Sequence, residues 1–182
     1  MSKEALILLA EGFEEIEAIT IIDVLRRAGV QLIIAGVEGK IISGAHGLKV
    51  EAELILSDYT NIPDVVILPG GLPGADNLKA SSEVNNMIKK VYEDKKIVAA
   101  ICASPAVVLS PLGVLDGKKA TCYPGFEDNF SDSIERSEEA VVIDENIITS
   151  RGPGTAFEFA LTLVKQLVDI KTAVSLRQGM LY

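Results

Sequence analysis

The chain has 182 residues, a hydrophobic content of 48% and a formal net charge of -9. This length and apolar fraction allow one domain over residues 1–182, with a full core that needs no disulfides. The acidic balance opposes binding to the phosphate backbone of nucleic acid, which requires clustered Lys and Arg. Charges or Gly interrupt every apolar run before the roughly 18 residues of a membrane span. We therefore expect neither nucleic acid nor a membrane as a partner.

Cysteine usage and the amino terminus bear on the compartment of the protein. The two cysteines, Cys102 and Cys122, are too few for a disulfide framework. The amino terminus lacks the basic region and the long apolar run of a signal peptide. These features predict a cytoplasmic protein.

The first third of the chain has the pattern of a strand, a helix and a second strand. Apolar runs of strand length cover Glu4 to Ala10 and Gln31 to Ala35. A helical periodicity lies between them, from about Glu14 to Ala28, and Gly29 ends it. Such a unit predicts parallel pairing of its two strands. The following segment, 40–52, alternates loosely and contains two glycines, which indicates a small hairpin or edge excursion.

The rest of the chain continues this alternation of strands and helices. Further strands are expected at Asp64 to Leu68, Lys96 to Cys102, Lys119 to Tyr123, Ala140 to Asp144 and Ile147 to Ser150, and helices at Ser82 to Glu93, from Pro105 onward, at Gly154 to Val168 and at Lys171 to Gln178. Ser82 and Ser104 are expected N-caps. Repeated units with near-continuous apolar strands predict an α/β fold, with a doubly wound, mostly parallel sheet covered by helices on both faces.

Ligands of such open sheets bind at the carboxyl ends of the strands. Three loops therefore matter: Glu11 to Glu17, Pro69 to Gly74 and Cys102 to Pro105. In the last of these, Ser104 and Pro105 predict that a helix begins directly after Cys102. The positive end of a helix favours thiolate over thiol and makes a sulfur nucleophilic and oxidisable. The alternative is that Cys102 is a small core residue, as most cytosolic cysteines are.

Two other loops offer groups that can assist a reactive sulfur. Gly70 and Gly71 leave bare backbone whose N–H groups can stabilise an oxyanion, although an ordinary strand-ending turn also explains them. Glu17 lies on a largely apolar stripe of its helix, so we expect burial to raise the pKa of its carboxyl and make it a proton donor. The carboxylates of Glu14 and Glu15 are interpreted as stabilising the positive end of their helix. The same interpretation is the alternative for Glu17.

The single histidine limits metal chemistry. A site built on several histidines is impossible with His46 alone, and a site of mixed ligands is not expected. His46 is interpreted as a solvated residue of a Gly-flanked loop, with the mouth of a pocket as the alternative. Cys122 falls inside an expected strand and is interpreted as structural.

At these residues the sequence resembles the DJ-1/ThiJ/PfpI family, specifically its DJ-1 branch with the bacterial homologues, over nearly the whole chain. The resemblance rests on five stretches: 10–17 (AEGFEEIE), 23–29 (DVLRRAG), 68–71 (LPGG), 99–103 (AAICA) and 149–155 (TSRGPGT). It implies a flavodoxin-like sandwich of the class I glutamine amidotransferase type, a homodimer and no cofactor. It also implies that Cys102 is a nucleophile-elbow cysteine, that Glu17 is its acidic partner, and that the backbone of Gly71 and Ala103 holds an oxyanion.

The sequence departs from the family pattern at two positions. Tyr123 stands where several members have a pocket histidine, which puts a histidine-assisted step in doubt. Ala103 stands where the protease branch has a histidine, and peptide hydrolysis needs such a base and acid. The candidate pocket-lining residues are Tyr123, His46, Asp23 and Arg27.

Three functions follow from the resemblance. The leading hypothesis is a cofactor-independent glyoxalase or deglycase-like enzyme that acts on 2-oxoaldehydes such as methylglyoxal through Cys102 and Glu17. The alternative is an oxidative-stress sensor or redox-regulated chaperone, in which Cys102 is oxidised to a sulfinic acid. A cysteine amidase or protease is the weaker alternative.

Overall fold

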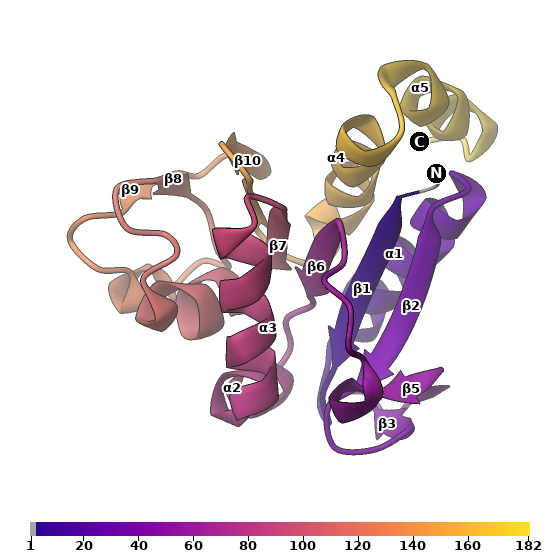
Figure 1. The fold of residues 1–182 in the computed structure, drawn as a ribbon. Coiled ribbons are helices and arrows are strands. Elements are labelled where there is room, and N and C mark those ends of the chain that lie inside the picture. The colour runs from indigo at the N-terminus through magenta and orange to yellow at the C-terminus, as the bar shows by residue number, and fades with distance from the viewer. Residues whose placement is uncertain (1–2) are drawn as a thin grey trace.

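A computed structural model describes residues 3–182 and contains a sheet of seven strands (Figure 1). The strands lie in the order β10-β11-β7-β6-β1-β2-β5, and all neighbours are parallel except β10 and β11. Their bounds are β1 (Glu4–Leu9), β2 (Gln31–Gly36), β5 (Leu54–Ile55), β6 (Val65–Leu68), β7 (Ile97–Ile101), β10 (Val141–Asp144) and β11 (Ile147–Ser150). The predicted α/β fold with a mostly parallel sheet is confirmed.

Helices cover both faces of this sheet. They are α1 (Glu15–Arg27), α2 (Gly74–Ala80), α3 (Ser82–Glu93), α4 (Ala156–Leu167) and α5 (Ile170–Gly179). The connection from β1 to β2 runs toward one edge of the sheet and that from β6 to β7 toward the other. Because such crossovers are right-handed, α1 and α3 cover opposite faces; Figure 1 shows α3 in front of the sheet and α1 behind it. Helix α4 packs on α1, and α5 packs on α4.

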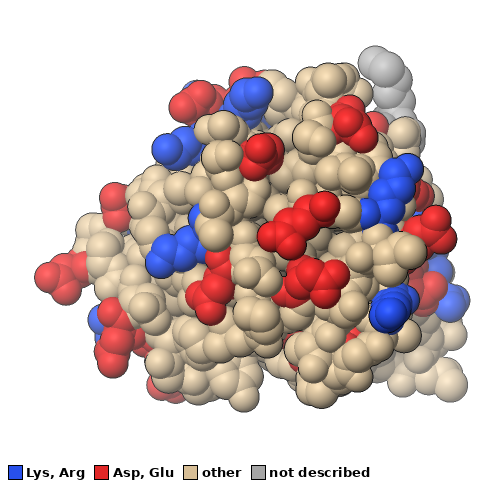
Figure 2. Space-filling view, turned by 90° about the horizontal axis from the view of Figure 1, so that it is seen from below, with Lys and Arg blue, Asp and Glu red and all other residues tan. Residues whose placement is uncertain are grey.

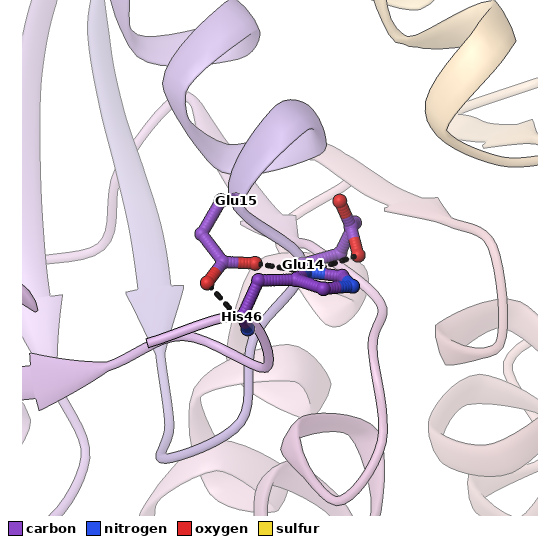
Figure 3. A group of neighbouring side chains, drawn as sticks. All are labelled: Glu14, Glu15 and His46. Atoms are coloured by element: carbon purple, nitrogen blue, oxygen red, sulfur yellow. Dashed lines mark hydrogen bonds and ion pairs between the residues drawn. The ribbon is translucent and has the colours of Figure 1, made fainter. Parts of the chain in front are cut away.

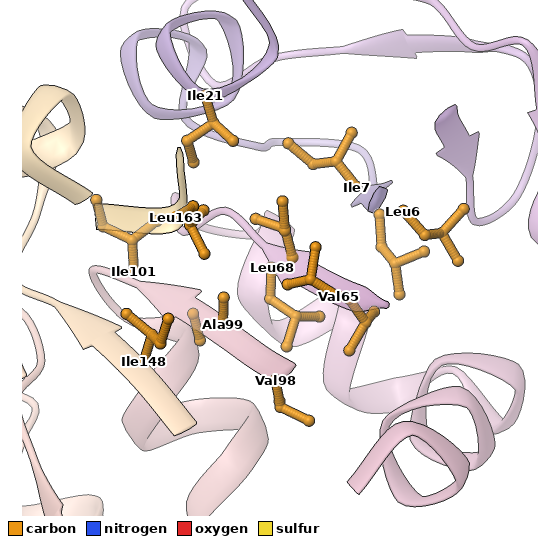
Figure 4. Packing of buried hydrophobic residues seen from close by; sticks show 14 of the residues in the cluster. Leu6, Ile7, Ile21, Val65, Leu68, Val98, Ala99, Ile101, Ile148 and Leu163 are labelled. Atoms are coloured by element: carbon orange, nitrogen blue, oxygen red, sulfur yellow. The ribbon is translucent and has the colours of Figure 1, made fainter. Parts of the chain in front are cut away.

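The apolar strands form the core of the molecule. Leu6 and Ile7 of β1, Val65 of β6 and Val98 of β7 have no exposed surface. Successive side chains of a strand point to opposite faces, and here both faces are covered, so β6 and β7 are apolar throughout and β1 is apolar after Glu4. Figure 4 shows Ile21 of α1 and the strand residues packed in this core. No helix within residues 3–182 is long and apolar enough to cross a bilayer.

The segment 40–52 forms the predicted hairpin. Its strands, β3 (Ile41–Ser43) and β4 (Lys49–Glu51), pair antiparallel in a separate two-stranded sheet. The loop between them carries His46 and returns to the start of α1, because the N–H of Ala45 donates to the carbonyl of Phe13. The hairpin therefore adds a wall beside the loop that follows β1.

The prediction of a strand at Lys119 to Tyr123 is wrong beyond its first two residues. Only β8 (Lys119–Ala120) is a strand, and it pairs with β9 (Glu135–Arg136) outside the main sheet. Downstream of β8, the N–H of Tyr123 donates to the carbonyl of Cys102 over 2.8 Å. The chain thus crosses over the end of β7 as a loop, and Cys122 lies in this loop and not in a strand.

Three local predictions also differ from the structure. Helix α2 was not predicted, because its seven residues are too short for a clear apolar period. The N-cap of α3 is Ser81, whose Oγ accepts from the N–H of Val84 over 3.3 Å, and Ser82 is the first helical residue. Ser104 is no N-cap either, since it has helical backbone angles and its Oγ donates to the carbonyl of Pro69 over 2.5 Å.

Candidate active site

The direction of the crossovers changes between β1 and β6, which makes the carboxyl ends of these two strands the expected place for a ligand. The loops after β1, β6 and β7 meet there. In Figure 2, which looks at the molecule from below Figure 1 and therefore onto this edge, acidic side chains are spread over the middle of the face. Lys and Arg lie mostly nearer its outline.

Cys102 occupies a sharp turn at the end of β7. Its φ angle is 65°, in the left-handed region that non-Gly residues rarely adopt. The turn is held from both sides, because the Cys102 N–H donates to the carbonyl of Ser150 over 3.0 Å and the Cys102 carbonyl accepts from Tyr123. A residue in such a conformation indicates that the surrounding structure imposes it. Cys102 is 9% exposed, so only a small part of this residue can be reached from solvent.

The glycine pair after β6 lies against this turn. A Cβ added at Gly70 would lie 2.5 Å from Cys102 Cβ and 3.0 Å from both Cys102 Sγ and Glu17 Oε2. Gly71 has a φ of 89°, and a Cβ there would lie 2.5 Å from the backbone nitrogen of Glu14. Both positions therefore require glycine, Gly70 for space and Gly71 for space and conformation.

Glu17 enters the site from the first turn of α1. Its side chain has no exposed surface, and its Oε2 accepts a hydrogen bond of 2.7 Å from the N–H of Gly70. The other oxygen, Oε1, is buried without a hydrogen-bond partner among the described residues. A buried, half-satisfied carboxylate is costly, whereas a neutral carboxylic acid is less so. Burial accordingly raises the pKa of Glu17 to about 7, with the nearby charge of Glu14 adding to the rise and the Gly70 and Cys102 hydrogen bonds opposing it.

The thiol of Cys102 interacts directly with the carboxyl of Glu17. Burial first, and then the negative charge of Glu17, raise the pKa of the thiol to about 12, while the N–H groups of Gly71 and Ala103 lower it. The prediction that the site favours the thiolate of Cys102 is therefore wrong, because the pKa of the thiol is raised and not lowered. The backbone donors are present, but burial and the carboxylate outweigh them. Because the two groups repel as anions, the pair loses its first proton at about pH 7 and keeps the second one well above neutral pH.

Tyr123 lies at the margin of this site. It is 43% exposed, and its ring packs on the loop after β11, where a Cβ at Gly152 would approach it to 2.9 Å. Its ring also meets Phe126 edge to face, with centroids 6.3 Å apart. Its backbone hydrogen bond to Cys102 places Tyr123 beside the turn at the end of β7, and its role in lining a pocket stays a prediction.

The other three candidate lining residues lie farther along the surface. Asp23 and Arg27 form an ion pair of 2.7 Å on the exposed side of α1, one to three turns beyond Glu17. The Nδ1 atom of His46 lies 2.8 Å from Glu15, and the imidazole is largely exposed. These contacts occupy the side chains elsewhere, and a role for them in lining the pocket of Cys102 stays a prediction.

Two groups of the site have no signal in the sequence that identifies them. Ser104 was interpreted as a helix cap, but its hydroxyl ties the loop after β7 to that after β6 through Pro69. Gly152 provides room for the ring of Tyr123. Ser104 and Gly152 acquire these roles only because the three loops meet in the fold.

Glu14 was predicted to stabilise the positive end of its helix. Its Oε1 accepts from the N–H of Ile16 and so caps α1.

Known proteins are similar in fold and sequence to most of this chain. The model of the DJ-1/PfpI family matches residues 3–166. The chain is 45% identical over 175 residues to Protein DJ-1 homolog B of Arabidopsis thaliana, which covers 95% of this chain and 40% of that protein. It thus spans less than half the length of this relative.

Two shorter relatives match from end to end or nearly so. Glutathione-independent glyoxalase DJR-1.2 of Caenorhabditis elegans is 38% identical over 168 residues, covering 91% of this chain and 89% of that protein. The solved structure of oxidized Toxoplasma gondii DJ-1 superposes with a TM-score of 0.94 at 39% identity, covering 100% and 99% of the two chains. On this evidence, the chain belongs to the DJ-1/PfpI family.

Proposed function

We propose that this protein is a cofactor-independent glyoxalase that converts small 2-oxoaldehydes such as methylglyoxal into 2-hydroxy acids in the cytoplasm. The observation that carries the proposal is the contact between the Cys102 thiol and the buried carboxyl of Glu17, which places the thiol beside an acid whose pKa is about 7. A nucleophile and a proton carrier side by side are what this internal redox reaction needs.

The first step is addition of the sulfur to the aldehyde. Transfer of the thiol proton to Glu17 generates the thiolate, and a bond forms between Sγ and the aldehyde carbon while the C=O π electrons move to oxygen. The N–H groups of Gly71 and Ala103, which lie against the sulfur, stabilise the developing oxyanion. Glu17 then returns its proton to this oxygen, and a hemithioacetal results.

The second step moves hydrogen between adjacent carbons. The Glu17 carboxylate takes the proton from the former aldehyde carbon, and the electron pair of that C–H bond forms an enediolate with the neighbouring carbonyl. Glu17 then gives the proton to the neighbouring carbon, and the hydroxyl proton of the first carbon passes to the second oxygen. The first carbon is oxidised to a thioester and the second is reduced to an alcohol.

The third step is hydrolysis. Water adds to the thioester carbon, the C–S bond breaks, and the 2-hydroxy acid leaves. The thiol and Glu17 again share one proton. The overall change is addition of one water to the 2-oxoaldehyde, so no external oxidant or reductant is required.

The C. elegans relative supports the class of reaction, since its name is that of a glutathione-independent glyoxalase. Steady-state turnover of methylglyoxal to lactate tests the proposal. Cys102→Ser and Glu17→Gln should each reduce kcat/KM by at least about 100-fold, while Cys122→Ser, a control at the other buried cysteine, should change it little. Unaltered turnover in both site variants would remove the mechanism.

We also propose that the chain is a homodimer, as the family resemblance implies. Support comes from an exposed apolar side chain on α1, Ile19 (39% exposed). Sedimentation velocity on the parent and on Ile19→Glu tests this. A dimer that dissociates in the variant is expected, and a monomeric parent would contradict it.

A redox-sensing role is the second candidate function. It is favoured by the solved relative from Toxoplasma gondii, which is described as oxidized. In this chain a protonated Glu17 beside Cys102 has the geometry to donate a hydrogen bond to an oxygen added to the sulfur. A redox sensor requires selective oxidation of Cys102, whereas an enzyme requires turnover of substrate. Oxidation of the two cysteines by peroxide therefore tests the sensing role separately.

A further inference from the structure

A second cluster of reactive side chains lies outside the Cys102 site, where the β3–β4 loop meets the start of α1. Figure 3 shows Glu14 and Glu15 pointing from the helix start toward the ring of His46. His46 Nδ1 lies 2.8 Å from Glu15 Oε2 and 3.6 Å from Glu14 Oε2. These three donor atoms are all within 4.8 Å of one another.

We propose that Glu14, Glu15 and His46 bind a divalent transition-metal cation, of the kind represented by Zn²⁺. The donor set is one imidazole nitrogen and two carboxylate oxygens, which suits Zn²⁺ with water as the fourth ligand. Tetrahedral bonds of about 2.0–2.2 Å separate neighbouring donors by about 3.4 Å. The separations of 2.8 and 3.6 Å lie on either side of that value, and the two carboxylate oxygens lie within 4.8 Å of each other, so modest side-chain shifts admit a cation.

Backbone hydrogen bonds hold both carboxylates in position. Glu15 Oε1 accepts from the N–H groups of His46 (2.6 Å) and Leu48 (3.3 Å), which leaves Oε2 toward the imidazole. Glu14 Oε1 accepts from the N–H of Ile16 over 3.2 Å, which leaves its Oε2 toward the same nitrogen. Orientation of ligands by outer hydrogen bonds is a regular feature of metal sites in proteins.

Gly44 provides the space for this arrangement. A Cβ at Gly44 would lie 2.3 Å from Glu15 Oε1 and 2.6 Å from its Cγ, so any other residue would push the carboxylate away. The φ angle of Gly44 is not in the left-handed region, and the requirement is therefore one of space alone. The backbone of the hairpin thus forms a cradle for the carboxylate.

The site is open to an incoming cation. The three side chains line a hollow of about 310 Å³ together with Ile16 and Leu48. The His46 side chain is 74% exposed, whereas those of both glutamates are 11% exposed. The helix start carries about half a positive charge, which the two carboxylates outweigh, so a net negative charge remains to attract a cation.

Calorimetric titration of the metal-free full chain with Zn²⁺ tests the proposal. One Zn²⁺ per chain is expected, and His46→Gln and Glu15→Gln should each weaken binding at least tenfold, within the range of about 10- to 100-fold for altered metal sites. Gly44→Ala should weaken it too, without removing a ligand. Glu138→Gln, a change at an exposed glutamate, should leave it unchanged.

The Cys102→Ser variant distinguishes Zn²⁺ binding at this cluster from Zn²⁺ binding at the Cys102 thiol. The proposal requires the variant to bind Zn²⁺ as the parent does. Loss of binding in Cys102→Ser with retention in His46→Gln would overturn it, because the metal would then be on the sulfur. Absence of binding to the parent would overturn it too, because a proton on His46 would then suffice to balance the two carboxylates. Unfolding midpoints without metal show whether each variant is folded.

Discussion

Glu17 in the first turn of α1 and Cys102 at the end of β7 contact each other, and the pair loses its first proton at about pH 7. The contact exists because the crossovers reverse between β1 and β6, which brings the loops after β1, β6 and β7 to one point of the sheet edge. Burial raises the pKa of both groups, and the Gly70 and Gly71 loop supplies the backbone donors on either side. The proposed chemistry depends on this pairing.

Gly70 packs against both groups, and a side chain there should disable the site. Gly70→Ala places a methyl 2.5 Å from Cys102 Cβ, so the sulfur and the carboxyl must move apart. A displacement of about 1 Å costs on the order of 100-fold in turnover. We expect that loss in kcat with methylglyoxal. Gly39→Ala is the matched control, because a Cβ at Gly39 meets no atom within 4 Å. Equal activities of the two variants would contradict this account of Gly70.

Substitution of Tyr123 tests whether the proposed reaction needs an acid other than Glu17. The proposed steps draw no proton from the phenol, and the ring is held by packing near Gly152 and Phe126. Tyr123→Phe retains the ring, so kcat/KM should stay within a few-fold of the parent value. General acid catalysis is typically worth about 100- to 10,000-fold. A loss of that size in Tyr123→Phe would assign the missing histidine's role to this hydroxyl.

The oxidation of the two cysteines tests the redox candidate. Cys102 lies in the site with a hydrogen-bonding acid beside it, whereas Cys122 is 3% exposed, and burial is the first cause of its raised pKa. Mass spectrometry after mild peroxide should therefore find added oxygen on Cys102 and little on Cys122. Glu17→Gln should lower the yield of the sulfinic acid. Equal oxidation of both cysteines would argue against selective sensing.

Folding stability should depend on pH through Glu17. Its pKa is raised from 4.5 to about 7, so the folded state holds the proton more tightly than the unfolded state does. The resulting stabilisation is fully present below about pH 4.5 and is lost as the pH rises through about 7, with a slope of at most about 1.4 kcal/mol per pH unit. Urea unfolding across this range should show the decline in the parent. In Glu17→Gln the decline should be smaller, and an identical slope would refute the assignment.

Much of the fold follows from the sequence, because the strands of a sheet covered on both faces must be apolar at every position. β6 and β7 are of this kind, β1 is apolar after Glu4, and β11 begins with two isoleucines before its buried Thr149 and Ser150. The segment after β8 differs, since the hydrogen bond from Tyr123 to the Cys102 carbonyl draws the chain out of extended pairing. Long-range contacts of this kind leave no local periodicity.

The sequence was enough to select the two candidate residues of the site, but not to predict the direction of the shift in the thiol pKa. Position after a buried strand identified Cys102, and an apolar helical stripe identified Glu17 as a buried acid. The sign of the thiol shift was missed, because a helix start argues for thiolate whereas burial beside a carboxyl argues against it. Only the fold shows that both influences act on one atom. The same holds for His46, whose glutamate neighbours come from the start of α1, about 30 residues earlier in the chain.

The most direct test is the pH dependence of Cys102 alkylation by iodoacetamide, followed by mass spectrometry. If the thiol and Glu17 share one proton, the rate should rise through about pH 7, where the pair loses its first proton, and then level off. In Glu17→Gln this rise should disappear. A parent rate that rises only near the pKa of an ordinary cysteine, about 8.5, or a rise near pH 7 that persists in Glu17→Gln, would contradict the account.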